Sequence, residues 1–315
     1  MRSITVSSKY INKKLEYVLK SEFPNMPISA MYKAFRKKDI RVNGIRVKED
    51  YLVNPGYKID IYISDSIIDG KPLKNDSEMN MGFTVVYEDS NILIVNKDQG
   101  IPVHPDSDQQ YNTLIDNVKS YLELKGDYSP KNKNTFVPSL CHRLDRNTGG
   151  LVIIAKNEEA LKTILDKIKN KEVKKYYQCL VQGHVEKKSE TLKAYLEKDS
   201  RKSRVFVSDA KSKNSVEIIT KYRVLSYETN YTKLEVELVT GRTHQIRAHM
   251  AYIGHPILGD GKYGSNQFNK SMGMKTQALW AYKLCFDFTG KSCLDYLKGK
   301  IFEVVPGFSL PKTKI

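Results

Sequence analysis

The segment HRLDRNTGGLVIIAK, residues 142–156, joins a charged loop to an apolar run of strand length. Because residues 151–155 carry no polar side chain, they predict a strand that is buried on both faces. Asn157, directly after it, is the predicted N-cap of a helix. The inward positions expected for this helix are Ala160, Leu161, Ile164, Leu165 and Ile168. A buried strand followed by a helix therefore holds the preceding loop against a folded core.

Asp145 lies in this loop between two cations, Arg143 and Arg146. Nearby positive charge favours the ionised form of a carboxylate, and the Gly149-Gly150 pair lets the backbone approach a bulky group closely. An ionised aspartate in such a loop is suited to attack a sugar or base carried on a phosphate backbone. A structural ion pair beside a turn fits the same residues, so the loop alone leaves both interpretations open.

Strand patterns continue on both sides of this segment. Residues 83–87 and 92–95 predict two paired strands around a polar turn at 88–91. Further strands are expected at 177–181, 216–224 and 234–238. Antiparallel-looking strands with interspersed helices favour an α+β fold over a doubly wound one. We expect this larger domain to occupy residues 81–315.

A second charged motif, TGRTHQIRAHM, follows the last of these strands. Thr243 can cap a helix whose apolar stripe begins at Ile246, and Arg247 lies on another face, where it is available to a carboxylate. His244 and His249 are five positions apart, ~500° around a helix, so they point to nearly opposite sides. They do not form the i, i+4 pair of metal-binding helices, and the sequence predicts no metal site.

Tyr177 lies near the start of a predicted strand, in KYYQCLVQG. It can stack on a base and also offers a phenolic oxygen, although an ordinary half-buried strand tyrosine fits the pattern equally well. The glycine-rich loop at 254–264 lacks the G-x-x-x-x-G-K-[ST] spacing of a P-loop. We therefore expect no nucleotide cofactor.

The first 65 residues predict a smaller α+β unit. A first helix is expected to bury Ile11, Leu15, Val18, Leu19 and Phe23. Ser29 is the predicted N-cap of a second helix, which ends at the cations Arg36, Lys37 and Lys38. Asn43-Gly44 predicts a hairpin turn, and residues 57–63 a half-buried strand. The polar stretch 66–80 is the predicted linker between two domains.

Charge and composition limit the functional classes. The chain has 315 residues, enough for two domains, and its 52 Lys and Arg against 36 Asp and Glu give a net charge of +16. Such a balance favours a polyanionic partner, nucleic acid above all, although a lysine-rich surface without a partner is the alternative. Four cysteines without C-x-x-C spacing exclude a disulfide scaffold and a zinc ribbon. With no bilayer-length apolar run and no signal-peptide pattern, we expect a cytoplasmic protein, and a monomer.

Together these motifs resemble the RluA-type pseudouridine synthases. The family's H-R-L-D-x-x-T-S-G, K-x-Y-x-x-L-V-x-G and T-G-R-T-H-Q-I-R-x-H stand here as HRLDRNTGG, KYYQCLVQG and TGRTHQIRAH, and VNKDQGIPVHP is similar to a fourth family motif. The likeness covers residues 83–305, and it departs from the family at Gly149, where serine is usual, and at Asp98, where proline is usual. The segment KKDIRVNGIRVKEDYLVNPGYKIDI resembles the RNA-binding domain of ribosomal protein S-four.

The resemblance implies an isomerase that converts uridine in RNA to pseudouridine, on a mixed, largely antiparallel sheet with flanking helices. The target base leaves its stack, because its reacting atoms are inaccessible inside a helix. Asp145 is the implied essential carboxylate, Arg247 its partner, Tyr177 the residue that stacks on the uracil, and Arg143 the side chain that fills the vacated space. No cofactor or metal is implied.

The remaining expected RNA contacts come from both domains. Arg242 and His244 belong to the second motif, and the resemblance to protein S-four points to Arg36, Lys37, Lys38 and Arg41 in the N-terminal domain. The expected substrate is ribosomal RNA of the large subunit, with transfer RNA as the runner-up. A non-catalytic RNA-binding assembly factor is a further alternative. A hydrolase with paired carboxylates is weaker, because Asp145 has no acidic neighbour in its motif.

Overall fold

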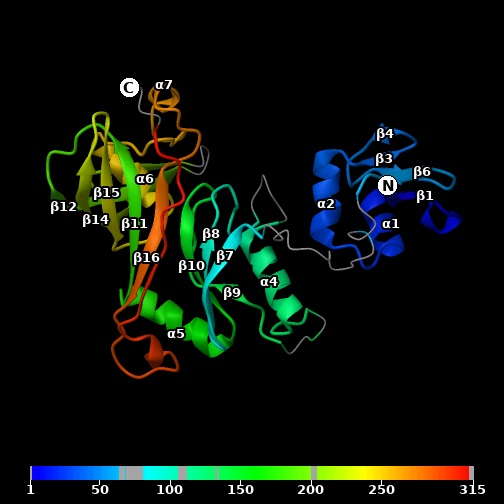
Figure 1. Ribbon diagram of the computed structural model, residues 1–315, viewed down its shortest axis with the longest axis horizontal. Coiled ribbons are helices and arrows are strands. Elements are labelled where there is room, and N and C mark those ends of the chain that lie inside the picture. The colour runs from blue at the N-terminus through cyan, green and yellow to red at the C-terminus, as the bar shows by residue number, and fades with distance from the viewer. Residues whose placement is uncertain are drawn as a thin grey trace. The chain divides into compact units, whose positions relative to one another are not determined.

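The computed structural model describes residues 2–63, 68, 81–105, 112–130, 132, 135–199 and 204–311. The chain forms two compact units, Met1–Met79 and Asn80–Ile315, and each is described by itself (Figure 1). Of the predicted linker, residues 66–80, all but Ile68 lie outside the described residues. Ile68 is buried and belongs to the apolar core of the first unit.

The first unit is a small sheet with two helices packed on it. Its elements are β1 (Arg2–Thr5), β2 (Lys13–Lys14), α1 (Leu15–Glu22), α2 (Ile28–Lys37), β3 (Ile40–Val42), β4 (Ile45–Arg46), β5 (Leu52–Val53) and β6 (Lys58–Ile61). The sheet order is β1-β6-β3-β4, and β2 pairs separately with β5. The predicted hairpin is confirmed: Asn43 and Gly44 have φ angles of 49° and 79°, as a type I′ turn requires.

Two predicted helix starts in this unit are wrong. The first helix begins at Leu15, because Lys13 and Lys14 form a strand with β5, and Ile11 is left 57% exposed. The second begins at Ile28 after Pro27, whose carbonyl accepts hydrogen bonds from the amides of two residues in the first turn. Ser29 therefore lies inside the helix and is not its N-cap.

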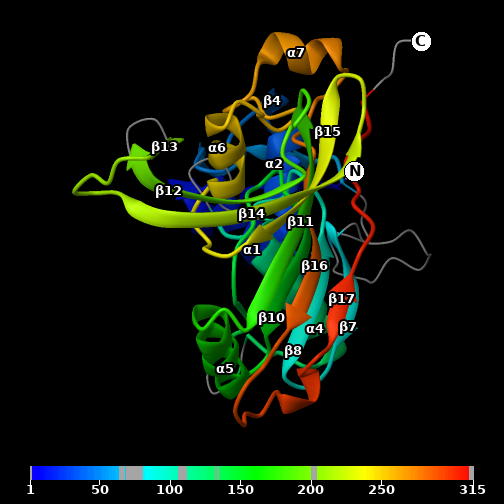
Figure 2. The same ribbon diagram turned by 90° about the vertical axis from the view of Figure 1, so that its left-hand side faces the viewer.

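The second unit is built on one long sheet. Its strands are β7 (Phe83–Glu88), β8 (Ile92–Lys97), β9 (Ser139–Leu140), β10 (Gly149–Ala155), β11 (Val173–Gln182), β12 (Ser189–Asp199), β13 (Arg204–Ser208), β14 (Val216–Tyr227), β15 (Tyr231–Leu238), β16 (Leu279–Phe286) and β17 (Ile301–Glu303). Its helices are α4 (Leu114–Lys125), α5 (Glu158–Lys169), α6 (Gln245–Tyr252) and α7 (Asn266–Ser271). The order is β13-β12-β14-β15-β11-β16-β10-β8-β7, with β9 on β10 and β17 on β16 (Figure 2).

The sheet is mixed but largely antiparallel, as expected for an α+β fold. Between named strands of the described chain, only the β10–β16 pairing is parallel. Every residue of β10 is buried, which confirms the prediction for this strand. No helix in the described ranges combines the length and apolar character needed to cross a bilayer.

Strand β10 is covered on both faces. Val152 and Ile154 belong to one apolar cluster, which includes residues of α4 and α6, whereas Leu151 and Ile153 pack in another with residues of α5. Asn157 caps α5 as predicted, since its side chain accepts from the amide of the third helical residue. Leu165 is an exception to the predicted apolar face, because its side chain is 45% exposed.

Candidate active site

The loop that carries Asp145 runs between β9 and β10 and is fixed at its end by two glycines. Gly150 has a φ of 117°, and a Cβ there would lie 2.2 Å from the carbonyl oxygen of Ala281 on the parallel neighbour β16. A Cβ on Gly149 would lie 2.3 Å from the indole ring of Trp280. The Trp280 ring therefore fills the space that the side chain of the family's usual serine would need at position 149.

Arg247 bridges two carboxylates at the centre of the site. From α6, its Nη1 donates to Oδ2 of Asp145 over 2.9 Å. Its Nε and Nη2 donate to the two oxygens of Asp260 over 2.7 Å and 3.0 Å. Burial by itself would lower the pKa of Arg247, but the hydrogen bonds and charges of both aspartates raise it above its ordinary value. The arginine is thus a fixed cation that orients the Asp145 carboxylate.

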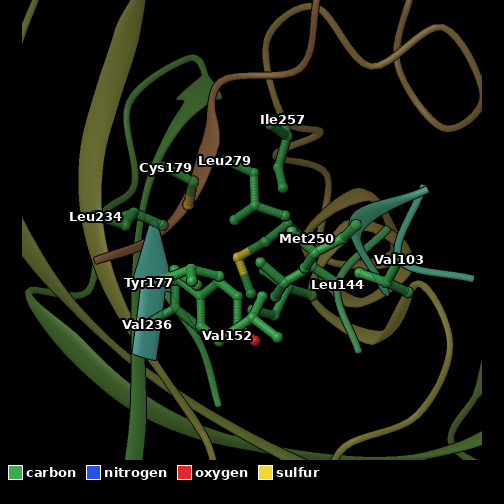
Figure 3. Close-up of a cluster of buried hydrophobic side chains, with 14 of the residues drawn as sticks. Val103, Leu144, Val152, Tyr177, Cys179, Leu234, Val236, Met250, Ile257 and Leu279 are labelled. Carbon is green, nitrogen blue, oxygen red and sulfur yellow. The ribbon is translucent and has the colours of Figure 1, made fainter. Parts of the chain in front are cut away.

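Tyr177 faces this pair from β11. Its side chain is only 4% exposed and lies among the apolar residues Val152, Leu144 and Val236 (Figure 3). Burial, and then the charge of Asp145, raises the pKa of the Tyr177 phenol well above its usual value. The phenol is therefore protonated at neutral pH, and its ring is held rigidly at the wall of the cavity.

His244 begins α6 in an unexpected way. It is the N-cap residue, in a left-handed conformation with a φ of 55°, whereas Thr243 is exposed and does not cap the helix as predicted. The ring is held from outside the helix, because Nδ1 lies 2.9 Å from the hydroxyl of Tyr263. Its Nε2 lies 3.9 Å from Oδ2 of Asp145. Burial lowers the pKa of His244 to about 4, although the charge of Asp145 acts in the opposite direction, so the ring is neutral at pH 7.

The two histidines of this motif do not meet. His249 is buried on the other side of α6, where its Nδ1 lies 3.0 Å from Oγ1 of Thr220. In the part of the chain that the structure describes, no group of three or more His, Cys, Asp or Glu residues could hold a metal ion.

Sequence reasoning missed two buried charged residues that support the site. Asp260 is completely buried and, besides binding Arg247, accepts from the amides of Lys262 and Tyr263. Lys97 is also fully buried, and its ammonium donates to three backbone carbonyls, including that of Arg146 beside Asp145. Burial lowers the pKa of Lys97 to about 7, against the opposing charges of two aspartates. Lys97 belongs to the quoted motif VNKDQGIPVHP and Asp260 to the glycine-rich loop at 254–264, but neither local pattern shows which groups the charge meets in the fold.

A cavity of about 480 Å³ lies beside Asp145, Tyr177 and Arg247. The predicted site residues of this unit all line it: Arg143, Asp145, Tyr177, Arg242, His244 and Arg247. Arg143 and Arg242 are exposed at its rim, whereas Arg247 and Tyr177 are buried at its wall. The cavity has the size of a small-ligand site, and its described lining residues include one carboxylate and six Lys and Arg side chains.

Three of the four predicted RNA contacts of the first unit lie at the C-terminal end of α2, and the fourth lies on β3. Arg36, Lys37 and Lys38 are exposed there, and Lys38 ends the helix with a φ of 61°. Arg41 is half-buried on β3, with its guanidinium 4.9 Å from the ring centre of Tyr62. These four cations form a basic corner on the unit.

The chain is similar in sequence to known proteins. The sequence pattern of RNA pseudouridylate synthase matches residues 91–252. The chain is 31% identical to the "Uncharacterized RNA pseudouridine synthase YlyB" of Bacillus subtilis, over 90% of this chain and 89% of that protein. It is 30% identical to the "Ribosomal large subunit pseudouridine synthase C" of Vibrio cholerae, over 84% of this chain and 81% of that protein.

A solved structure shares the fold. "Human RNA Pseudouridylate Synthase Domain Containing 4" superposes with a TM-score of 0.55, over 72% of this chain and 88% of that chain, at 20% sequence identity.

Proposed function

Because the chain belongs to the RluA-type RNA pseudouridylate synthase family, and is thus an isomerase that acts on RNA, we propose that it converts specific uridines of large-subunit ribosomal RNA to pseudouridine. The bond between the sugar and the uracil nitrogen breaks, the base turns, and a carbon–carbon bond to the same sugar forms. The product has the composition of the substrate, so the reaction needs no oxidant and no energy source.

The observation that carries the proposal is the contact between Asp145 and Arg247. A carboxylate held 2.9 Å from a permanently charged guanidinium is oriented and kept available for chemistry at the sugar or its protons. Asp145 is the acid among the described residues that line the cavity, and it faces the ring of Tyr177 and the neutral His244. One carboxylate among cationic and apolar side chains fits a reaction at a single flipped nucleotide of a polyanion.

The other residues are assigned to substrate binding. Tyr177 stacks on the uracil and is placed to exchange a proton with its ring through the phenol. Arg143, exposed at the rim of the cavity, fills the space that the flipped nucleotide leaves in the RNA. Arg242 and His244 bind the backbone around it, and the basic corner of the first unit, Arg36, Lys37, Lys38 and Arg41, binds RNA outside the cavity.

The choice of ribosomal RNA rests on the relative from Vibrio cholerae, whose name specifies the large ribosomal subunit, and on the net charge of +16. Transfer RNA is the second candidate substrate. We also propose that the protein acts as a cytoplasmic monomer.

Pseudouridine mapping of total RNA from cells that lack this gene tests the proposal. Loss of one or a few sites in large-subunit ribosomal RNA, with recovery when the wild-type gene is returned but not the Asp145→Asn variant, is the expected result. Loss confined to transfer RNA would keep the chemistry and replace the substrate. If every site remains, a non-catalytic assembly role replaces the enzymatic one.

A further inference from the structure

A half-buried lysine lies in the catalytic cavity, one strand repeat away from Tyr177. Lys175 and Tyr177 are two positions apart on β11, so their side chains leave the same face of the strand, and both line the cavity. Among the described residues, the Lys175 ammonium makes no hydrogen bond and no ion pair. Burial lowers the pKa of Lys175, and no acidic group opposes that effect. The Lys175 ammonium is thus partly removed from water without a counter-charge among the described residues, and an anionic ligand would supply that charge.

His142 also lines this cavity, and its ring carries a hydrogen-bond donor that no described residue pairs. Its Nε2 accepts from the backbone amide of Ile153 over 3.2 Å, so the proton of the neutral ring is on Nδ1. Nδ1 is buried and has no hydrogen-bond partner among the described residues. Burial, and then the charge of Lys175, lowers the pKa of His142 to about 3, so the ring stays neutral at pH 7. The Nδ1–H is therefore a fixed donor that lacks an acceptor.

The charge around these two residues is positive. Lys169 and Lys171, exposed near the end of α5, line the cavity as well. Asp145, the one acid among the described lining residues, is already bound by Arg247. The part of the cavity that contains Lys175 thus calls for an anion with several acceptor oxygens, which a phosphate supplies.

We propose that Lys175, with the neutral ring of His142 near it and Lys169 and Lys171 at the rim, forms a subsite for one backbone phosphate of the RNA beside the flipped uridine. The inference rests on the proposed function of the cavity. Residues i and i+2 of a strand, which share one face, are ~6.6 Å apart. An anion at Lys175 therefore lies within one nucleotide of a base that stacks on Tyr177. The phosphate supplies the counter-charge that the described residues do not give to Lys175.

Three variants test the subsite: Lys175→Met, Lys175→Arg and the control Lys174→Met. Lys174 is the preceding residue, on the opposite side of β11, and it forms an ion pair with Asp287 at 2.5 Å, so its loss removes the same net charge outside the cavity. Binding is measured by filter retention of large-subunit ribosomal RNA from cells that lack the gene, over a range of salt concentrations. Turnover on the same RNA gives KM and kcat, and thermal unfolding of the free protein gives Tm.

We expect Lys175→Met to raise KM at least roughly tenfold, as loss of a charged hydrogen bond does, with kcat changed less than about threefold. The slope of log affinity against log salt should become shallower by ~0.7, the value for one phosphate of a single strand. Lys175→Arg should keep most of the affinity, and Lys174→Met should match the wild type. The Tm of free Lys175→Met should equal or exceed that of the wild type, since a half-buried cation without a counter-charge has been removed.

The subsite would be overturned if Lys175→Met and Lys174→Met had the same KM and the same salt slope while the wild type formed pseudouridine normally. The proposed function would be unaffected by that result. A lower Tm together with an unchanged slope would show a structural lysine and would also overturn the subsite. A wild type that binds the RNA but forms no pseudouridine would defeat the proposed function, and the salt slope would still decide the subsite.

Discussion

At the scale of single residues, the central contact could be predicted but its support could not. Arg247 on the free face of a helix and Asp145 in a cationic loop are visible in local patterns, and the structure joins them at 2.9 Å. Asp260 and Lys97 are different, because a buried charge is recognised by what surrounds it in the fold. Lys97 binds the carbonyl of Arg146, 49 positions away, and Asp260 binds Arg247, 13 positions away on a helix. The cap of α6 shows the same limit: Thr243 has the local chemistry of a cap, but the bond from His244 to Tyr263 selects another start.

Asp260→Asn tests whether Asp260 positions Arg247. An amide has one acceptor oxygen and no charge, so one of the two bonds to Arg247 is lost and the guanidinium can shift away from Asp145. We expect kcat to fall roughly tenfold to a hundredfold with KM nearly unchanged, because the effect acts in the transition state. Steady-state kinetics measures this split, and Asp287→Asn, at an exposed ion pair, is the control. A kcat equal to that of the control would exclude the positioning role.

Gly149→Ser should be harmful here, although serine is the residue usual in the resembled family. The added Cβ would meet the ring of Trp280, and we expect a loss of about 1–3 kcal/mol in the free energy of unfolding, as overpacked cores show. Combining it with Trp280→Leu should recover part of that loss, measured by urea denaturation. Additive effects of the two substitutions would contradict the steric explanation.

His249 should make the fold sensitive to mild acid. Burial lowers its pKa to about 4, from an ordinary value of 6.5, so between these values the unfolded chain binds more protons than the folded one. Stability is therefore complete above pH 6.5 and falls by up to about 1.4 kcal/mol per pH unit as the pH drops toward 4. Urea denaturation at pH 7.5, 6.0 and 5.0 should show a smaller decline for His249→Gln. Parallel curves for the two proteins would refute this assignment.

At the scale of elements, regular patterns predicted most of what the structure contains. The buried strand β10, the Asn-Gly hairpin and the Asn157 cap are confirmed, since each depends on residues within a few positions of one another. The predicted start of the first helix was wrong because of a pairing between distant residues. β2 pairs with β5, and α1 therefore begins only after β2. The parallel contact between β10 and β16 is also a distant pairing, and no periodicity could reveal it.

Asn157→Ala measures the contribution of this cap. The Asn157 side chain accepts from the amide of Ala160 at 2.8 Å, and its loss leaves that donor without its protein acceptor. We expect unfolding to become easier by about 1 kcal/mol, read from the shift of the denaturation midpoint, whereas Asn157→Asp should stay within a few tenths of the wild type. No difference between the two variants would show that the cap contributes little.

At the scale of the whole molecule, net charge and motif spacing were the informative properties. The charge of +16 indicated a polyanionic partner, and the motifs indicated one catalytic unit, whose fold and family the structure and its relatives bear out. Three-dimensional grouping was needed to see that a single cavity gathers Arg143, Tyr177 and Arg242 around Asp145. The choice of RNA depends on shape and unpaired loops, which have no linear code in this chain.

Replacing Arg36, Lys37 and Lys38 together with glutamine separates RNA capture from chemistry. These cations are exposed on the first unit, so we expect a higher KM and a kcat close to that of the wild type. The slope of log affinity against log salt concentration should become shallower by about two. Filter binding and steady-state kinetics on the same RNA provide both values. An unchanged salt slope would remove this basic corner from the RNA-binding surface.

The most direct test of the central claim uses purified protein, RNA from cells that lack the gene, and a buffer without nucleotide or added cofactor. Pseudouridine is measured by chemical labelling and primer extension for the wild type and for Asp145→Asn, with RNA binding measured alongside. The account predicts that the wild type forms pseudouridine at defined uridines, and that Asp145→Asn binds the RNA but forms product at least roughly 10³-fold more slowly. Normal turnover by Asp145→Asn would contradict it.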